Sequence, residues 1–120
     1  MTIRAQLRRL HSPDVFDLEH YMPEDAEVFG ILVQAMIGPQ EGVGEESFDF
    51  LVCTPHWLAT QVLNRGYVLG RHYLFLSRYD YGVLRQAIQD VCDQAHGEDW
   101  QSVAAYLGRF GHWEFEDYKP

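Results

Sequence analysis

Cysteine and histidine are the residues of this chain best suited to nucleophilic catalysis or metal binding, and their spacing favours neither. The sequence holds two cysteines and six histidines. Cys53 precedes His56 by three residues, but a catalytic cysteine usually lies at a helix N-terminus with its base supplied from elsewhere in the chain. Cys92 and His96 lie four apart on a predicted helix, with Cys92 on the apolar face. We predict no metal and no cofactor, and two buried cysteines; a nucleophilic Cys53 is the alternative.

Sequence motifs for phosphate or acyl-enzyme chemistry are also missing. Gly38, Gly42 and Gly44 form a glycine-rich loop, but no lysine accompanies them and no strand-to-helix junction follows. A GxSxG elbow does not occur. Pairs of carboxylates are common, yet surface acids are expected at this composition, and a glycosidase cleft would be unusual in 120 residues. The sequence predicts a protein that is not an enzyme.

Carboxylates are distributed unevenly along the chain. Eighteen Asp and Glu residues face nine Lys and Arg residues, for a net charge of −9. Residues 14–64 carry ten carboxylates and no lysine or arginine, whereas residues 1–13 carry three arginines and no acid. Such a field repels nucleic acid and anionic membranes and attracts basic surfaces. The charge therefore predicts a protein partner; the alternative is that acidity only maintains solubility.

The elements expected to position these acids are three strands, a helix, a strand and two helices. Alternating apolar residues indicate the strands, and Thr54, Asp80 and Asp99 are typical helix N-caps. The expected strands cover Thr2–His11, Val28–Ile37, Ser47–Thr54 and Arg71–Ser77, and the helices cover Pro55–Leu63, Tyr81–His96 and a short segment after Asp99.

This element order predicts an α+β fold. We expect a single antiparallel sheet of about four strands packed against two or three helices, in the order βββαβαα. Trp57, Leu58 and Val62 should face inward from the first helix, and Trp100 should also lie in the core. The composition fits one domain over residues 1–120.

Localisation is predicted from hydropathy. The sequence has no apolar run of about 18 residues, the length that a membrane-spanning helix needs. The N-terminal residues Met1, Thr2, Ile3 and Arg4 lead into a polar segment without an apolar secretion core. We therefore expect a cytoplasmic protein with no membrane partner.

Two segments carry a family resemblance. The first is Gly44-Glu45-Glu46-Ser47-Phe48-Asp49-Phe50-Leu51-Val52-Cys53-Thr54-Pro55-His56-Trp57-Leu58, preceded by Ile37-Gly38-Pro39. The second is Trp113-Glu114-Phe115-Glu116-Asp117-Tyr118. Together they resemble the Immunity protein 8 family of bacterial polymorphic toxin and contact-dependent competition systems, over nearly the whole chain.

The resemblance implies a small α+β immunity protein that binds the toxin domain encoded beside it and neutralises it by stoichiometric inhibition. It brings no catalytic residues with it. The acidity of the chain favours a basic toxin domain that targets nucleic acid, because enzymes that bind phosphate groups need positive charge. The alternative is an acidic structural or regulatory subunit without a toxin partner, and the oligomeric state stays open.

Acidic and aromatic side chains are the expected contacts with this partner. The hairpin loop and the strand after it form one candidate surface, with a preceding acidic segment expected beside it, and the C-terminal segment forms a second. The residues concerned are Glu41, Glu45, Glu46 and Asp49, then Glu24, Asp25 and Glu27, then Trp113, Glu114, Glu116 and Asp117.

Overall fold

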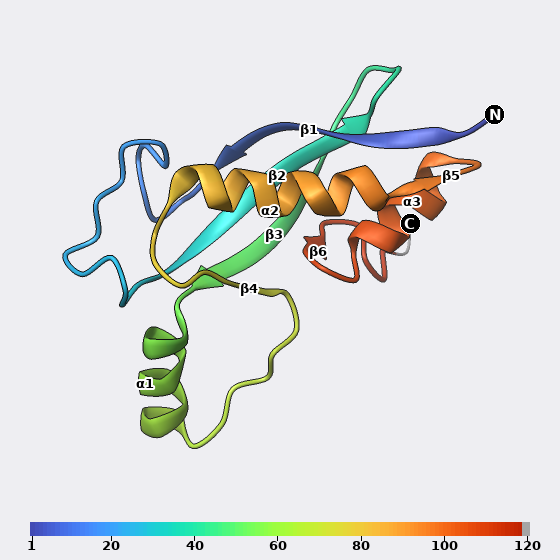
Figure 1. Ribbon diagram of the computed structural model, residues 1–120. Helices are drawn as coiled ribbons and strands as arrows, with labels where there is room; N and C mark the ends of the chain where they lie inside the picture. Colours follow the sequence, from blue (N-terminus) through green and yellow to red (C-terminus); the bar gives the residue numbers. More distant parts are fainter. Residues whose placement is uncertain (119–120) are drawn as a thin grey trace.

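The computed structural model describes residues 1–118, in which six strands and three helices form an α+β fold (Figure 1). The long strands come first along the chain, and the helices alternate with short strands after them. The elements are β1 (Ile3–His11), β2 (Gly30–Pro39), β3 (Glu46–Cys53), α1 (Pro55–Arg65), β4 (Tyr73–Phe75), α2 (Tyr81–Gln94), β5 (His96–Gly97), α3 (Trp100–Leu107) and β6 (His112–Trp113).

The sheet is mixed, so the prediction of an antiparallel sheet of about four strands is wrong in both respects. Its strand order is β4-β3-β2-β1-β5, and β6 also pairs with β3. β4 runs parallel to β3 because the chain leaves β3 through α1 and returns over a long loop in the same direction. β5 and β6 have two residues each, too few to show alternation in the sequence.

The predicted α+β class, the hairpin and the helix starts are confirmed. β2 and β3 pair antiparallel from Gly30–Cys53 to Ile37–Glu46. The Thr54 side chain caps α1 by accepting a hydrogen bond from the backbone N–H of Trp57 at 3.4 Å. Asp80 and Asp99 cap α2 and α3 in the same manner.

The core lies between the sheet and the two later helices. Alternate residues of β2 and β3 are buried on one face, among them Val33 and Phe48. Leu84, Ile88 and Cys92 form the buried stripe of α2, one residue per helical turn, as the sequence period predicts. This packing holds the start of β3 and the ends of the helices in fixed positions.

Helix α1 does not pack into this core, contrary to the prediction that Trp57, Leu58 and Val62 face inward. None of its residues is buried, and Val62 is 38% exposed. The helix projects from the end of the sheet below β4 (Figure 1). The indole ring of Trp57, a residue of α1, lies against Gly30. A Cβ atom at position 30 would leave no room for this ring. The apolar residues of α1 do recur at helical spacing, but the face that they form is partly exposed to solvent.

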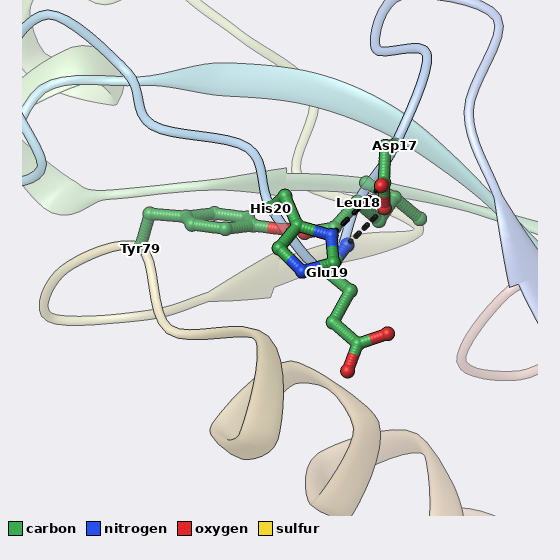
Figure 2. Close-up of polar contacts among 5 residues, drawn as sticks. All are labelled: Asp17, Leu18, Glu19, His20 and Tyr79. Carbon is green, nitrogen blue, oxygen red and sulfur yellow. Dashed lines mark hydrogen bonds and ion pairs between the residues drawn. The ribbon is translucent and has the colours of Figure 1, made fainter.

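The acidic loop between β1 and β2 is anchored where β2 begins. The carboxylate of Asp14 accepts a hydrogen bond from the backbone N–H of Leu32 at 2.8 Å. The hydroxyl of Tyr79 donates to the carbonyl oxygen of Leu18, as Figure 2 shows. Beside it, the carboxylate of Asp17 accepts from the backbone of Glu19 at 3.1 Å and bonds the His20 ring at 2.8 Å. The loop thus has a defined position.

No helix within residues 1–118 combines the length and the apolar character needed to cross a membrane.

Candidate functional site

Glu46 joins three elements at one end of the sheet. It is the first residue of β3, and its Oε1 oxygen accepts a hydrogen bond from the indole N–H of Trp100 at 2.8 Å. The same oxygen accepts a second hydrogen bond from the indole N–H of Trp113, also at 2.8 Å. Trp100 begins α3 and Trp113 ends β6. One carboxylate therefore ties β3, α3 and the C-terminal segment together.

Asp99 sets the position of Trp100. Its carboxylate accepts a hydrogen bond from the backbone N–H of Ser102 at 2.7 Å and so caps α3. This hydrogen bond lowers the pKa of Asp99, which is solvent-exposed. The carboxylate is consequently ionised at neutral pH, one residue before the indole.

A row of aromatic rings continues from Trp113 along the C-terminal segment. The ring of Trp113 stacks on buried Phe48, with centroids 6.5 Å apart and planes inclined by 10°. Trp113 meets Phe115 edge to face at 6.1 Å, and Phe115 meets Tyr118 edge to face at 5.6 Å. These are the attractive arrangements of aromatic pairs. The row is anchored in the core at one end and reaches solvent at the other.

A cleft of about 520 Å³ lies between α3 and the C-terminal segment. It combines aromatic faces with two carboxylates, and its lining among the described residues includes no lysine or arginine. We call it the aromatic cleft; it is lined by Glu46, Asp99, Trp100, Gln101, Trp113, Phe115 and Tyr118.

The hairpin loop that connects β2 and β3 borders this end of the molecule. Glu41 and Trp100 both line a second cleft, of about 370 Å³, beside the aromatic cleft. Glu45 forms an exposed ion pair with Arg9 of β1 at 2.7 Å. The charge of Glu45 is therefore partly offset within the protein itself.

Arg8 of β1 supports the same hairpin. Its guanidinium donates hydrogen bonds to the carbonyl oxygens of Pro39 at 2.6 Å and of Gly42 at 3.0 Å. The arginines near the N-terminus, a local excess of positive charge in the sequence, are thus partly used to hold the acidic hairpin. Among the described residues, neither Arg8 nor Arg9 contacts the acids of the C-terminal segment or Glu98 and Asp99, which precede α3.

Two acids of the C-terminal segment hold that segment in place. The backbone N–H of Ser47 donates to the carboxylate of Glu114 at 2.7 Å, and the N–H of Glu114 donates to the carbonyl of Ser47 at 3.1 Å. Glu116 forms an ion pair with Arg71. Asp117 is exposed and has φ of 60°, a conformation that Asp and Asn tolerate better than most residues.

The structure brings the two predicted contact surfaces together and separates a third group from them. The hairpin and the C-terminal segment, treated as alternatives in the sequence, meet at Glu46. The expected proximity of the segment from Glu24 to Glu27 is wrong, because this segment lies before β2 while the hairpin follows β2. Ten residues of extended strand, roughly 30 Å, separate the two regions.

Asp49 takes a position that differs from the other hairpin acids. It lies inside β3, opposite Gln34 on β2. Its Oδ1 oxygen is buried, with no hydrogen-bond partner among the described residues. Asp49 is therefore part of the sheet rather than of the loop surface.

Sequence reasoning did not predict that Asp99, Trp100, Phe115 and Tyr118 belong to the aromatic cleft. Trp100 was expected in the core, but it is only half-buried, as is Trp113. The available signal was its place directly after the N-cap Asp99, because the first N–H groups of a helix lack intrahelical partners and are satisfied by polar side chains or water.

The cysteines are buried, as predicted, and poorly suited to nucleophilic chemistry. Burial raises the pKa of Cys53 to about 11 and that of Cys92 to about 12. The reactive thiolate is therefore scarce at neutral pH. Residues 1–118 hold no group of three or more His, Cys, Asp or Glu side chains placed to bind a metal ion.

Comparison with known proteins identifies the family. The family model described as Immunity protein 8 matches residues 5–118 of the 120-residue chain. The chain belongs to the Immunity protein 8 family. Neither the curated proteins nor the solved structures include a match to it.

Membership of the Immunity protein 8 family confirms the resemblance noted in the two sequence motifs. It implies an immunity function in a toxin system and hence a toxin protein as the partner. Both motifs contribute residues to the end of the molecule that holds the aromatic cleft, since Glu46 belongs to the first motif and Trp113 to the second.

Proposed function

We propose that the protein binds a cognate bacterial toxin domain in the cytoplasm and neutralises it by stoichiometric inhibition. The aromatic cleft and its acidic surroundings form the centre of the contact. The toxin domain is basic and acts on nucleic acid, so an acidic inhibitor competes with its substrate and associates quickly.

The observation that carries this proposal is the aromatic cleft itself. Interfaces derive most of their binding energy from a few partly buried aromatic side chains surrounded by polar groups. Trp100 and Trp113 are held in fixed positions by Glu46, so little conformational entropy is lost when a partner covers them. Glu98, Asp99 and Asp117 add negative charge around them.

Two matched sets of substitutions test the location of the contact. One removes three charges near the cleft: Glu41→Gln, Glu98→Gln and Asp117→Asn. The other removes three charges at the far end: Glu24→Gln, Asp25→Asn and Glu27→Gln. All six side chains are exposed, so both variants should fold. The toxin to be used in this test is the C-terminal domain of the protein encoded by the neighbouring gene.

The cleft set should lower the association rate by about three- to tenfold at low salt, and the far set should lower it less. Stopped-flow measurements give the rates, and survival of cells that express the toxin gives protection. Equal effects of both sets would mean that only net charge matters. If the unaltered protein neither binds the toxin nor protects cells, the protein is an interaction subunit of another kind.

A further inference from the structure

The aromatic cleft has a composition that selects positive charge. Its walls present the rings of Trp100, Trp113, Phe115 and Tyr118, and the faces of such rings attract cations. Asp99 places an ionised carboxylate on the same lining. A purely apolar occupant would strip water from this carboxylate without replacing its hydrogen bonds, which is unfavourable. An anion would meet two acids.

Glu46 strengthens this selection. Its Oε1 oxygen accepts both indole hydrogen bonds, which places this carboxylate beside the N–H edges of the two indoles. Because the indole N–H groups are already engaged, the tryptophans offer a new ligand mainly their ring surfaces. Flat ring surfaces next to carboxylates suit a planar cation better than a spherical one.

The guanidinium of arginine is such a planar cation. It stacks on aromatic rings and donates paired hydrogen bonds to carboxylates, and it is less strongly hydrated than an ammonium group. The volume of the cleft, about 520 Å³, is ample for one such side chain. Arginine is also enriched among the residues that dominate protein interfaces.

We propose that the aromatic cleft is a socket for one arginine side chain of the toxin domain. The side chain enters between α3 and the C-terminal segment, its guanidinium stacks on the aromatic walls, and it pairs with Asp99. This inference rests on the proposed function for the identity of the partner. Binding of a guanidinium to the cleft can be measured without any toxin.

The direct test uses Nα-acetyl-arginine amide as the probe and the uncharged Nα-acetyl-citrulline amide as its neutral counterpart. The indole N–H resonances of the three tryptophans are followed by NMR at constant ionic strength. The arginine probe should shift those of Trp100 and Trp113 and leave that of Trp57 unchanged, because Trp57 lies on α1 away from the cleft. Equal shifts with citrulline, or none with arginine, overturn the proposal.

Substitutions at the exposed walls test the contribution of the rings. Tyr118 is 64% and Phe115 39% exposed, so Tyr118→Leu and Phe115→Leu should leave the fold intact. Each should weaken probe binding by about two- to fivefold. Phe16→Leu is the matched control, because Phe16 is fully exposed on the loop between β1 and β2. Equal losses in all three variants contradict a specific role of the cleft.

Asp99→Asn tests the carboxylate. Asparagine caps helices as well as aspartate does, so α3 should persist while the charge is lost. Asp93→Asn on α2 is the control with the same change of charge. Lys119→Gln is a further control, because this lysine follows Tyr118 in the sequence. If Lys119→Gln shifts the indole resonances of Trp100 and Trp113 in the absence of the probe, the occupant is the chain's own lysine and the proposal fails.

Toxin binding separates this inference from the proposed function. If Tyr118→Leu and Asp99→Asn weaken toxin binding together with probe binding, both stand. If the toxin is neutralised but the probe does not bind, the arginine socket is wrong and the immunity function stands. If the probe binds but the toxin is not neutralised, the immunity function is wrong.

Discussion

Both indole N–H groups at the aromatic cleft donate to one oxygen of Glu46. Hydrogen bonds to a charged acceptor are worth about 1.5–3 kcal/mol each, more than those between neutral groups. A single side chain therefore supports both the packing of the C-terminal segment and the placement of the two tryptophans.

Substitution of Glu46 should separate its hydrogen bonds from its charge. Glu46→Leu leaves two half-buried indole N–H groups without their acceptor and should lower the free energy of unfolding by about 2–4 kcal/mol. Glu46→Gln keeps an accepting oxygen and should cost less than about 1.5 kcal/mol. Urea unfolding followed by circular dichroism provides the comparison. Equal stabilities of the two variants would show that these hydrogen bonds contribute little.

Two buried thiols and one half-buried phenol predict a loss of stability at alkaline pH. Burial raises the pKa of Cys53 to about 11, and that of Cys92 and Tyr79 to about 12. All three ionise more easily in the unfolded chain, where their pKa values are about 9 to 10. Their stabilising contribution is complete below the unfolded pKa and is lost as pH rises through the folded pKa.

The free energy of unfolding should therefore decline above about pH 9, which urea titrations at a series of pH values would measure. Cys92→Ala should be less stable at neutral pH but show a shallower decline, because one of the three groups is gone. An unchanged slope in this variant would mean that another group controls the alkaline limit.

At the scale of elements, α1 and β4 form a part of the molecule that differs from the rest. Residues 50–79 contain no aspartate or glutamate. Pro55, Leu58, Val62, Leu63 and Phe75 line an apolar surface there. Leu63 is 84% and Phe75 50% exposed. The segment is therefore apolar and free of acids, whereas the opposite end is aromatic and acidic.

Gly30 should control how α1 is attached. A Cβ atom added at Gly30 would lie 2.3 Å from the ring of Trp57, so Gly30→Ala should displace the indole and lower stability by about 1–3 kcal/mol. The resonance of the Trp57 indole N–H and the free energy of unfolding report the two effects. Gly70→Ala is the control, because a Cβ there meets nothing within 4 Å.

A double substitution completes this test. If Gly30→Ala acts through the indole, it should cost much less in a Trp57→Leu background, because leucine leaves more room above the strand. A cost that is the same in both backgrounds would assign the effect to the strand backbone instead.

Local signals predicted most elements but not their long-range arrangement. The glycine-rich loop and the N-caps Thr54, Asp80 and Asp99 located the hairpin and the helix starts correctly, because these depend on adjacent residues. The direction of β4 depends on where a long loop returns, and β6 is defined only by its partner β3. Neither leaves a periodic pattern in the sequence.

The site could be predicted as acidic and aromatic but not as a cleft. Its second motif contributed Trp113, whereas Trp100 comes from a segment that has only a helix cap to mark it. Glu46 was expected to contact a partner directly, yet it accepts two internal hydrogen bonds. Which acids remain available to a partner depends on tertiary contacts that spacing does not encode.

At the scale of the whole molecule, negative charge is concentrated in two separated regions. The longest dimension is 46 Å, and β2 lies between the acidic loop and the hairpin. At physiological ionic strength the Debye length is about 8 Å, so charges at one end are screened from a partner at the other. This separation is what allows the two matched triple variants to distinguish contact from general attraction.

The outer edge of β3 has a consequence for recognition. That edge is divided between β6, which pairs at Phe48 and Asp49, and β4, which pairs from Leu51 to Cys53. Its backbone groups are occupied, so a toxin cannot extend the sheet there by adding a strand. If the proposed toxin contact lies at this end, it is made by side chains and not by a strand added to β3. Substitutions of those side chains would then change which toxin is bound and leave the fold unchanged.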